Sequence, residues 1–141
     1  MKKRFLLLSF TIILLISCSR SNETARPSLY LIPDGYRGWV AVEYDKDNGQ
    51  PTEMEGDYTV FHVDRNGRSR TKTLLTHEGW ATNKYYYVSD GGERKELKPG
   101  KMIHGATEGT ENTNYTIEFF FVGSADEFDK AGDYRREYKT N

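Results

Sequence analysis

The ionisable side chains of this 141-residue sequence show few spacings that support metal binding or catalysis. His62, His77 and His104 lie 15 and 27 residues apart, which matches no close-pair pattern of zinc ligands. The sequence also contains no Gly-x-Ser-x-Gly elbow, no His-Glu-x-x-His pair and no glycine-rich phosphate loop. We therefore expect no bound metal, no cofactor and no enzymatic activity.

A carboxylate-rich turn is the first remaining candidate for chemistry. Asp45, Asp47 and Gly49 have the composition of a calcium loop, but an EF-hand would need glycine and glutamate where this chain has Gln50 and Gly56. Alternating apolar residues on both sides of the segment are typical of strands, whereas an EF-hand loop lies between helices. We interpret the segment as a solvated hairpin turn.

Glu118 is the second candidate, because it stands inside the apolar stretch of residues 115–122. A carboxylate buried there would be a candidate for general acid–base catalysis. A carboxylate near the rim of the sheet would be an ordinary strand residue. The pattern favours the rim position.

Four aromatic residues form a candidate ligand-binding surface: Trp39, Trp80, Tyr85 and Tyr87. Exposed on one face, such rings would stack on sugars. Packed inside the domain, they would belong to its core, which is the commoner fate of large aromatic residues in strands.

Arg68, Arg70 and Lys72 form a second candidate binding surface. They alternate along one strand, so their side chains project from one face. They either bind an anionic polymer or lipid headgroups, or prevent edge-to-edge pairing of an edge strand.

Cys18, the single cysteine, ends a segment with the composition of a secretion signal. Residues 2–4 are basic, and residues 5–16 are apolar apart from Ser9 and Thr11. A helix of twelve residues rises roughly 18 Å, which is too short for the roughly 30 Å hydrocarbon core of a bilayer. The segment therefore predicts export and not a membrane span.

Residues 15–18, Leu-Ile-Ser-Cys, resemble the lipobox of bacterial lipoproteins. The resemblance implies that the Cys18 thiol accepts a diacylglyceryl group and that residues 1–17 are removed as a signal peptide. Two or more acyl chains anchor a protein stably. The expected partner is then the cell membrane or an outer membrane, the latter favoured by Ser19, with the domain exposed to the periplasm or the cell exterior.

The rest of the chain predicts one domain. Removal of residues 1–17, which hold three of the 20 basic residues, leaves 17 basic and 21 acidic residues, so no basic field attracts nucleic acid. Residues 18–27 are polar and predict a flexible tether. Residues 28–132 form the expected domain, and residues 133–141 a loosely held charged tail.

Short alternating segments separated by glycine turns predict a mainly β domain, a single β-sandwich. Strands are expected at residues 28–32, 38–44, 57–63, 68–75, 84–88, 93–97, 102–103 and 115–122. Residues 77–83 and 108–114 are expected to form loops, the latter because it contains no apolar side chain. Ser124 and Glu127 form a capping box that predicts one short C-terminal helix over residues 125–131.

Residues 30–44 (YLIPDGYRGWVAVEY) resemble an uncharacterised family of small secreted and lipoprotein domains that open with an Ile-Pro-x-Gly-Tyr-x-Gly-Trp-Val pattern. The likeness returns at residues 56–71, 85–97 and 119–130. It implies no particular activity and no catalytic residues. The succession of strands also resembles prealbumin-like (transthyretin-like) and carboxypeptidase-regulatory sandwiches, a likeness that concerns the fold alone.

Three functions are consistent with these features. The first, favoured by the anchor and by the lack of catalytic motifs, is a non-enzymatic binding or structural module of the cell envelope. The second is a protein inhibitor of a cell-wall hydrolase that inserts the loop at residues 108–114 or 77–83. The third is a glycan-binding module that uses Trp39 and Trp80.

Overall fold

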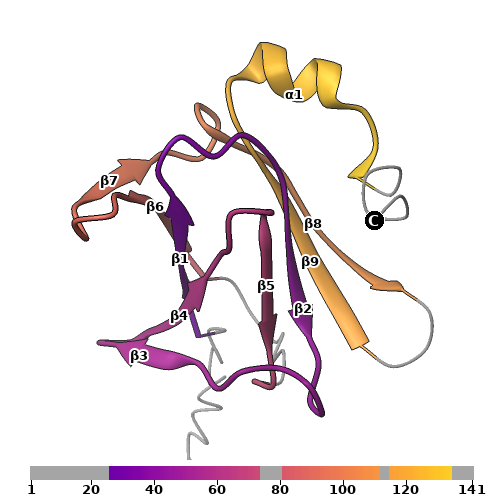
Figure 1. The fold of residues 1–141 in the computed structure, drawn as a ribbon. Coiled ribbons are helices and arrows are strands. Elements are labelled where there is room, and N and C mark those ends of the chain that lie inside the picture. Colours follow the sequence, from indigo (N-terminus) through magenta and orange to yellow (C-terminus); the bar gives the residue numbers. More distant parts are fainter. Residues whose placement is uncertain (1–25, 74–80, 112–114, 135–141) are drawn as a thin grey trace, which may run out of the picture.

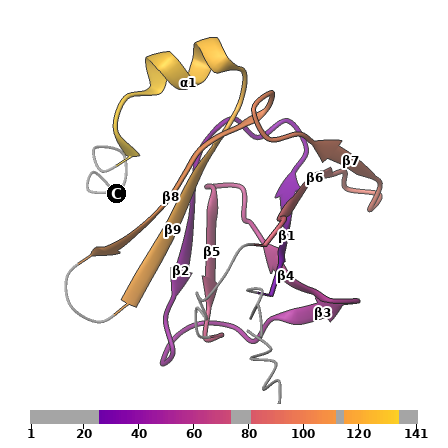
Figure 2. The same ribbon diagram turned by 180° about the vertical axis from the view of Figure 1, so that it is seen from behind.

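The computed structural model describes residues 26–73, 81–111 and 115–134. Two β-sheets face each other, and one short helix lies at one end of them (Figures 1 and 2). This confirms the predicted β-sandwich with one short C-terminal helix. The first sheet has the order β3-β4-β1-β6-β7, made of Glu53–Glu55, Tyr58–His62, Ser28–Pro33, Lys84–Val88 and Arg94–Leu97. The second has the order β5-β2-β9-β8, made of Arg68–Thr71, Gly38–Tyr44, Tyr115–Val122 and Ile103–Glu111.

Both sheets mix parallel and antiparallel pairs. Strand β1 lies between β4 and β6 and is parallel to both, and β2 is parallel to β5. Parallel neighbours cannot be joined by a tight turn, so the chain must leave the sheet between them. It does so by crossing to the opposite sheet, since β2 follows β1 and β5 follows β4.

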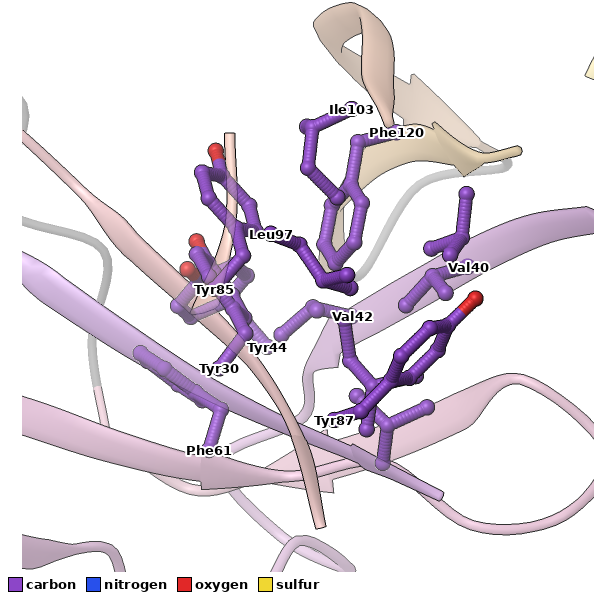
Figure 3. Close-up of a cluster of buried hydrophobic side chains, with 13 residues drawn as sticks. Tyr30, Val40, Val42, Tyr44, Phe61, Tyr85, Tyr87, Leu97, Ile103 and Phe120 are labelled. Carbon is purple, nitrogen blue, oxygen red and sulfur yellow. The ribbon is translucent and has the colours of Figure 1, made fainter. Parts of the chain in front are cut away.

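The main core lies between the sheets (Figure 3). Tyr30 of β1 is fully buried, and its ring lies 4.9 Å from that of Phe120 of β9 and 5.0 Å from that of Tyr85 of β6. Val40 and Val42 of β2 fill the space beside them and are also fully buried. The period-two pattern of the sequence thus directs one face of each central strand inward.

A smaller apolar cluster covers the outer face of the second sheet. Ala41, Ile117 and Phe119 are buried there and pack with Trp39 and Tyr134. Strand β9 is therefore buried on both faces and lies between β2 and β8, as expected for a central strand.

The C-terminal helix α1, Ala125–Ala131, has the predicted ends. The Ser124 hydroxyl accepts a bond from the backbone N–H of Glu127, and the Glu127 carboxylate accepts one from the N–H of Ser124 at 2.6 Å. This capping box satisfies two groups that the first turn leaves without partners. Phe128 then packs α1 onto the sheet, with its ring 5.7 Å from that of Phe121.

One expectation about the irregular segments was wrong, and one short strand was missed. Residues 108–111, expected in a loop, form the end of β8 and pair with β9, because backbone hydrogen bonds hold this end of the edge strand, whose sequence Glu-Gly-Thr-Glu has no apolar residue. Strand β3 was not expected, since its three residues are all exposed. Of the predicted tail, Asp133 and Tyr134 are described, and Tyr134 stacks on Phe119 with ring centroids 4.0 Å apart. Residues 74–80, 112–114 and 135–141 lie outside the described part.

Gly67, in the turn between β4 and β5, requires the freedom of glycine. Its φ is +77°, and an added Cβ would overlap the hydroxyl of Tyr36, which donates a hydrogen bond to the carbonyl of Trp39. The turn and the first residues of β2 are therefore packed against each other.

We expect Gly67→Ala to lower the free energy of unfolding by more than about 3 kcal/mol, because it adds a clash to the strain of a left-handed residue. Gly100→Ala is the matched control. Its φ is +75° but nothing lies within 4 Å of the added Cβ, so strain alone should cost about 1–2 kcal/mol. Urea denaturation measures both, and equal losses would contradict the packing described here.

Candidate functional site

The structure separates the predicted aromatic surface. Tyr85 and Tyr87 of β6 point into the core and are 5% and 7% exposed. For these two rings the core alternative holds, and not the ligand-binding surface. Trp80 lies outside the described residues. Trp39 is half-buried on the outer face of the second sheet and contacts three other rings. Of the three residues that the structure describes, Trp39 is therefore the one that is partly exposed.

The predicted basic surface is partly used to neutralise a buried charge. Glu43 of β2 is 2% exposed and accepts hydrogen bonds from Arg70 at 2.6 Å and from Arg68 at 3.3 Å. The parallel register pairs Glu43 with Arg70, so both arginines lie on its face of the sheet. Strand β5 is at the sheet edge, and Lys72 beyond it is exposed. Two of the three cations thus have a structural role inside the fold.

Sequence reasoning missed Glu43. The signal that could have found it is its position on the same face of β2 as Trp39 and Ala41, both expected to be covered if β2 were central. A buried carboxylate needs cationic or hydrogen-bonded partners. The alternating Arg68 and Arg70 were the residues in the sequence that could supply them.

Glu118 bridges the two sheets. It accepts a hydrogen bond from the hydroxyl of Tyr30 at 2.7 Å and from that of Tyr44 at 2.9 Å. Tyr30 belongs to the first sheet, whereas Tyr44 and Glu118 belong to the second. The carboxylate is thus half-buried and points between the sheets, rather than at the rim that the sequence favoured.

Two of the tyrosines near Glu118, Tyr30 and Tyr85, are held in their protonated form. Burial, together with the negative charge of Glu118, raises the pKa of Tyr30 well above its ordinary value. The same two causes raise the pKa of Tyr85 from 10.0 to about 12. The hydroxyls therefore stay hydrogen-bond donors at neutral pH, and the cluster acts as a link between the sheets.

An aromatic cavity of about 410 Å³ lies beside Trp39, between the second sheet and the C-terminal segment. Its lining residues come from β2, the start of β8, α1 and the segment after α1: Trp39, Gly105, Phe128, Asp129, Gly132, Asp133 and Tyr134. The ring of Trp39 lies 5.8 Å from that of Phe128 and 5.6 Å from that of Tyr134. Its volume lies in the range of small-molecule sites, but it is a depression that is largely open to solvent.

Gly105 allows this arrangement. It lies in an irregularity of β8 between His104 and Thr107, and its φ is +59°. A Cβ there would lie 2.7 Å from the ring of Phe128 and 3.2 Å from that of Trp39. The bulge thus lets α1 approach the sheet closely enough for the ring of Phe128 to meet that of Trp39.

Trp39 also carries an unsatisfied donor. In the part of the chain that the structure describes, its indole nitrogen is buried and has no hydrogen-bond partner. A buried group of this kind costs about 1–3 kcal/mol, and such exceptions need an explanation. An unpaired donor beside a cavity is consistent with a binding site in which a ligand supplies the missing hydrogen-bond acceptor.

Two further observations concern metal ions and membranes. Within the described ranges, no three histidine, cysteine, aspartate or glutamate residues lie close enough to hold a metal ion. Those ranges also contain no helix with the length and apolarity needed to cross a membrane.

Comparisons with known proteins give a family and a fold. The profile of a family of unknown function, DUF6843, matches residues 24–130. The fold is similar to that in the crystal structure of a "Putative Lipoprotein from Bacillus anthracis", which is 24% identical in sequence, with a TM-score of 0.65 over 84% of this chain and 90% of that one. No curated protein matches the sequence.

We expect Glu118→Gln to lower the free energy of unfolding by about 1–3 kcal/mol, because the amide replaces one of the two accepting oxygens with an NH₂ donor and removes the charge that strengthens both hydrogen bonds. It should also lower the pKa of Tyr85, since the charge that helps to raise it is gone. Urea denaturation measures the first effect and ultraviolet absorbance of tyrosinate the second. The control is Glu93→Gln, in an exposed turn, and indistinguishable results for the two variants would contradict the bridging role.

Proposed function

The chain belongs to DUF6843, a family of unknown function, so we infer its role from its own residues. We propose that it is a membrane-anchored lipoprotein whose β-sandwich is a non-enzymatic binding module of the cell envelope. The anchor is Cys18, acylated after residues 1–17 are removed. The module faces the periplasm or the cell exterior from the cell membrane or the outer membrane.

Two observations support the anchoring. The lipobox-like residues 15–18 close a short apolar segment, and a protein of similar fold carries the name lipoprotein. Nine residues lie between Cys18 and the start of β1 at Ser28. Even fully extended, they span no more than roughly 30 Å. The domain would therefore stay close to the lipid surface.

The aromatic cavity around Trp39 is the observation that carries the binding function. It combines three aromatic side chains with two carboxylates, Asp129 and Asp133. Mostly apolar pockets with a few polar groups are the usual form of small-molecule sites. Rigid aromatic rings also bind at a low cost in conformational entropy.

The other two functions have less support. An inhibitor that inserts residues 108–114 would use a segment whose first four residues pair with β9 as part of β8. A glycan-binding module would use Trp39 and Trp80, of which Trp80 lies outside the described residues, and it would lack the rings of Tyr85 and Tyr87, which lie in the core. Hydrolysis of an envelope substrate by the purified protein, abolished by substitution of one carboxylate, would contradict the non-enzymatic assignment.

We expect the native protein to partition with membranes, and Cys18→Ala to abolish this, because no other thiol can be acylated. Mass spectrometry of the native N-terminus should show a diacylglyceryl-modified Cys18. Ser19→Ala keeps the thiol and is the control. An unmodified Cys18, or processing that is insensitive to globomycin, would contradict the anchoring.

We expect soluble cell-wall fragments or extracted envelope lipids to raise the melting temperature of the full-length protein, with the rise lost in Phe128→Ala, because this variant removes one wall of the cavity. Tyr86→Ala, on the outer face of the other sheet, is the control. Circular dichroism checks that both variants are folded. A rise that survives Phe128→Ala would place binding elsewhere.

A further inference from the structure

Helix α1 is attached to the sandwich by few side chains. None of its seven residues is buried. Its aromatic contact with the second sheet is the half-buried ring of Phe128, which lies 5.7 Å from the ring of Phe121 and 5.8 Å from that of Trp39. The ring of His104 stacks on the same side chain at 5.4 Å. One side chain therefore supplies most of the apolar attachment of the helix.

The two ends of α1 allow it to move as a unit. Gly123 precedes its N-cap, and Gly132 is its C-cap with a φ of +71°. Glycine tolerates large changes in φ and ψ, and hinges are often formed by such small residues. Near the first hinge, the ion pair of Arg37 with Glu127 joins two half-exposed side chains, and such pairs contribute little stability. Movement about these ends would break no strand pairing, since β9 ends before Gly123.

The closed arrangement is also imperfectly packed. The depression between α1 and the second sheet is largely open to solvent. The indole nitrogen of Trp39 is buried and has no hydrogen-bond partner among the described residues. Two of the rings that pack on Trp39, those of Phe128 and Tyr134, belong to α1 and the segment after it. A buried donor without an acceptor raises the free energy of the closed form, and water would satisfy it if these rings moved away.

We propose that α1 is a latch, which opens about Gly123 and Gly132 while the sandwich stays folded. Opening withdraws Phe128 from the second sheet and uncovers the rings of Trp39 and Phe121, the latter 4% exposed in the closed form. The core between the sheets contains no residue of α1 in the described part of the chain, so it takes no part in the movement. The latch opens with or without a ligand and does not depend on the binding function proposed above.

Hydrogen exchange followed by NMR tests the latch in the full-length protein in detergent. Trp80→Phe leaves one indole signal, that of Trp39. The backbone N–H of Phe128, bonded to the carbonyl of Ser124 at 3.0 Å, reports on the helix. Relative to their intrinsic rates, we expect these two groups to exchange within about threefold of each other. Both should exchange at least about hundredfold faster than the amides at the centre of the β2–β9 pairing, which open only on global unfolding.

A pair of variants on the helix isolates the attachment. Phe128→Ala should speed exchange of the Trp39 indole N–H at least about tenfold, because it removes the ring that holds the helix. The β2–β9 amides should stay within about threefold of the parent, because the core is intact. Lys130→Ala shortens an exposed side chain of the same helix, and should leave the indole exchange within about twofold of the parent.

Four outcomes would overturn the latch. Indole exchange as slow as that of the β2–β9 amides would mean that α1 stays closed until the sandwich unfolds. Fast exchange of the Phe128 N–H with a slow indole N–H would mean that the helix frays without leaving Trp39. Unchanged indole exchange in Phe128→Ala would mean that other groups cover the nitrogen. Loss of β2–β9 protection in that variant would make α1 part of the same cooperative unit as the core.

Discussion

The burial of β9 on both of its faces is the constraint on which the rest of the structure depends. One face supplies Phe120 and Val122 to the core between the sheets, and the other supplies Ile117 and Phe119 to the outer cluster. An apolar outer face must be covered, because exposed patches of this kind favour aggregation or association. Helix α1 and Tyr134 provide part of that cover, and the aromatic cavity lies where they meet β2.

The second sheet accommodates the buried carboxylate of Glu43 and the half-buried carboxylate of Glu118 differently. Glu43, on the outer face, is neutralised by arginines of the edge strand, whereas Glu118, on the inner face, is solvated by tyrosine hydroxyls. In both cases the partner comes from another strand, so the interactions depend on correct pairing of the strands. A slip by one residue would turn either carboxylate to the opposite face and leave it without these partners.

Local sequence patterns predicted most of the fold. The parts that depend on partners distant in the sequence could not be predicted from such patterns. The alternation in β2 and the capping box at Ser124 are encoded by neighbouring residues, so both elements were predicted within a residue or two. The end of β8 and all of β3 have no apolar pattern and exist because another strand pairs with them. Trp39 was a candidate from the sequence, but Phe128 and Tyr134 belong to its site only through the return of the chain after β9.

The alternation of the chain between the two sheets also affects how fast the domain folds. Strand β1 acquires its neighbours from residues 31 and 55 positions further along, so its pairing waits until most of the domain has been brought together. In such non-local topologies, long loops must close before the stabilising contacts can form. Domains of this type therefore fold in milliseconds to seconds rather than microseconds. A chain with one cysteine has no intramolecular disulfide to lock early intermediates. Slow, cooperative folding keeps such a polypeptide extended for longer after synthesis, which would suit the export proposed for this chain.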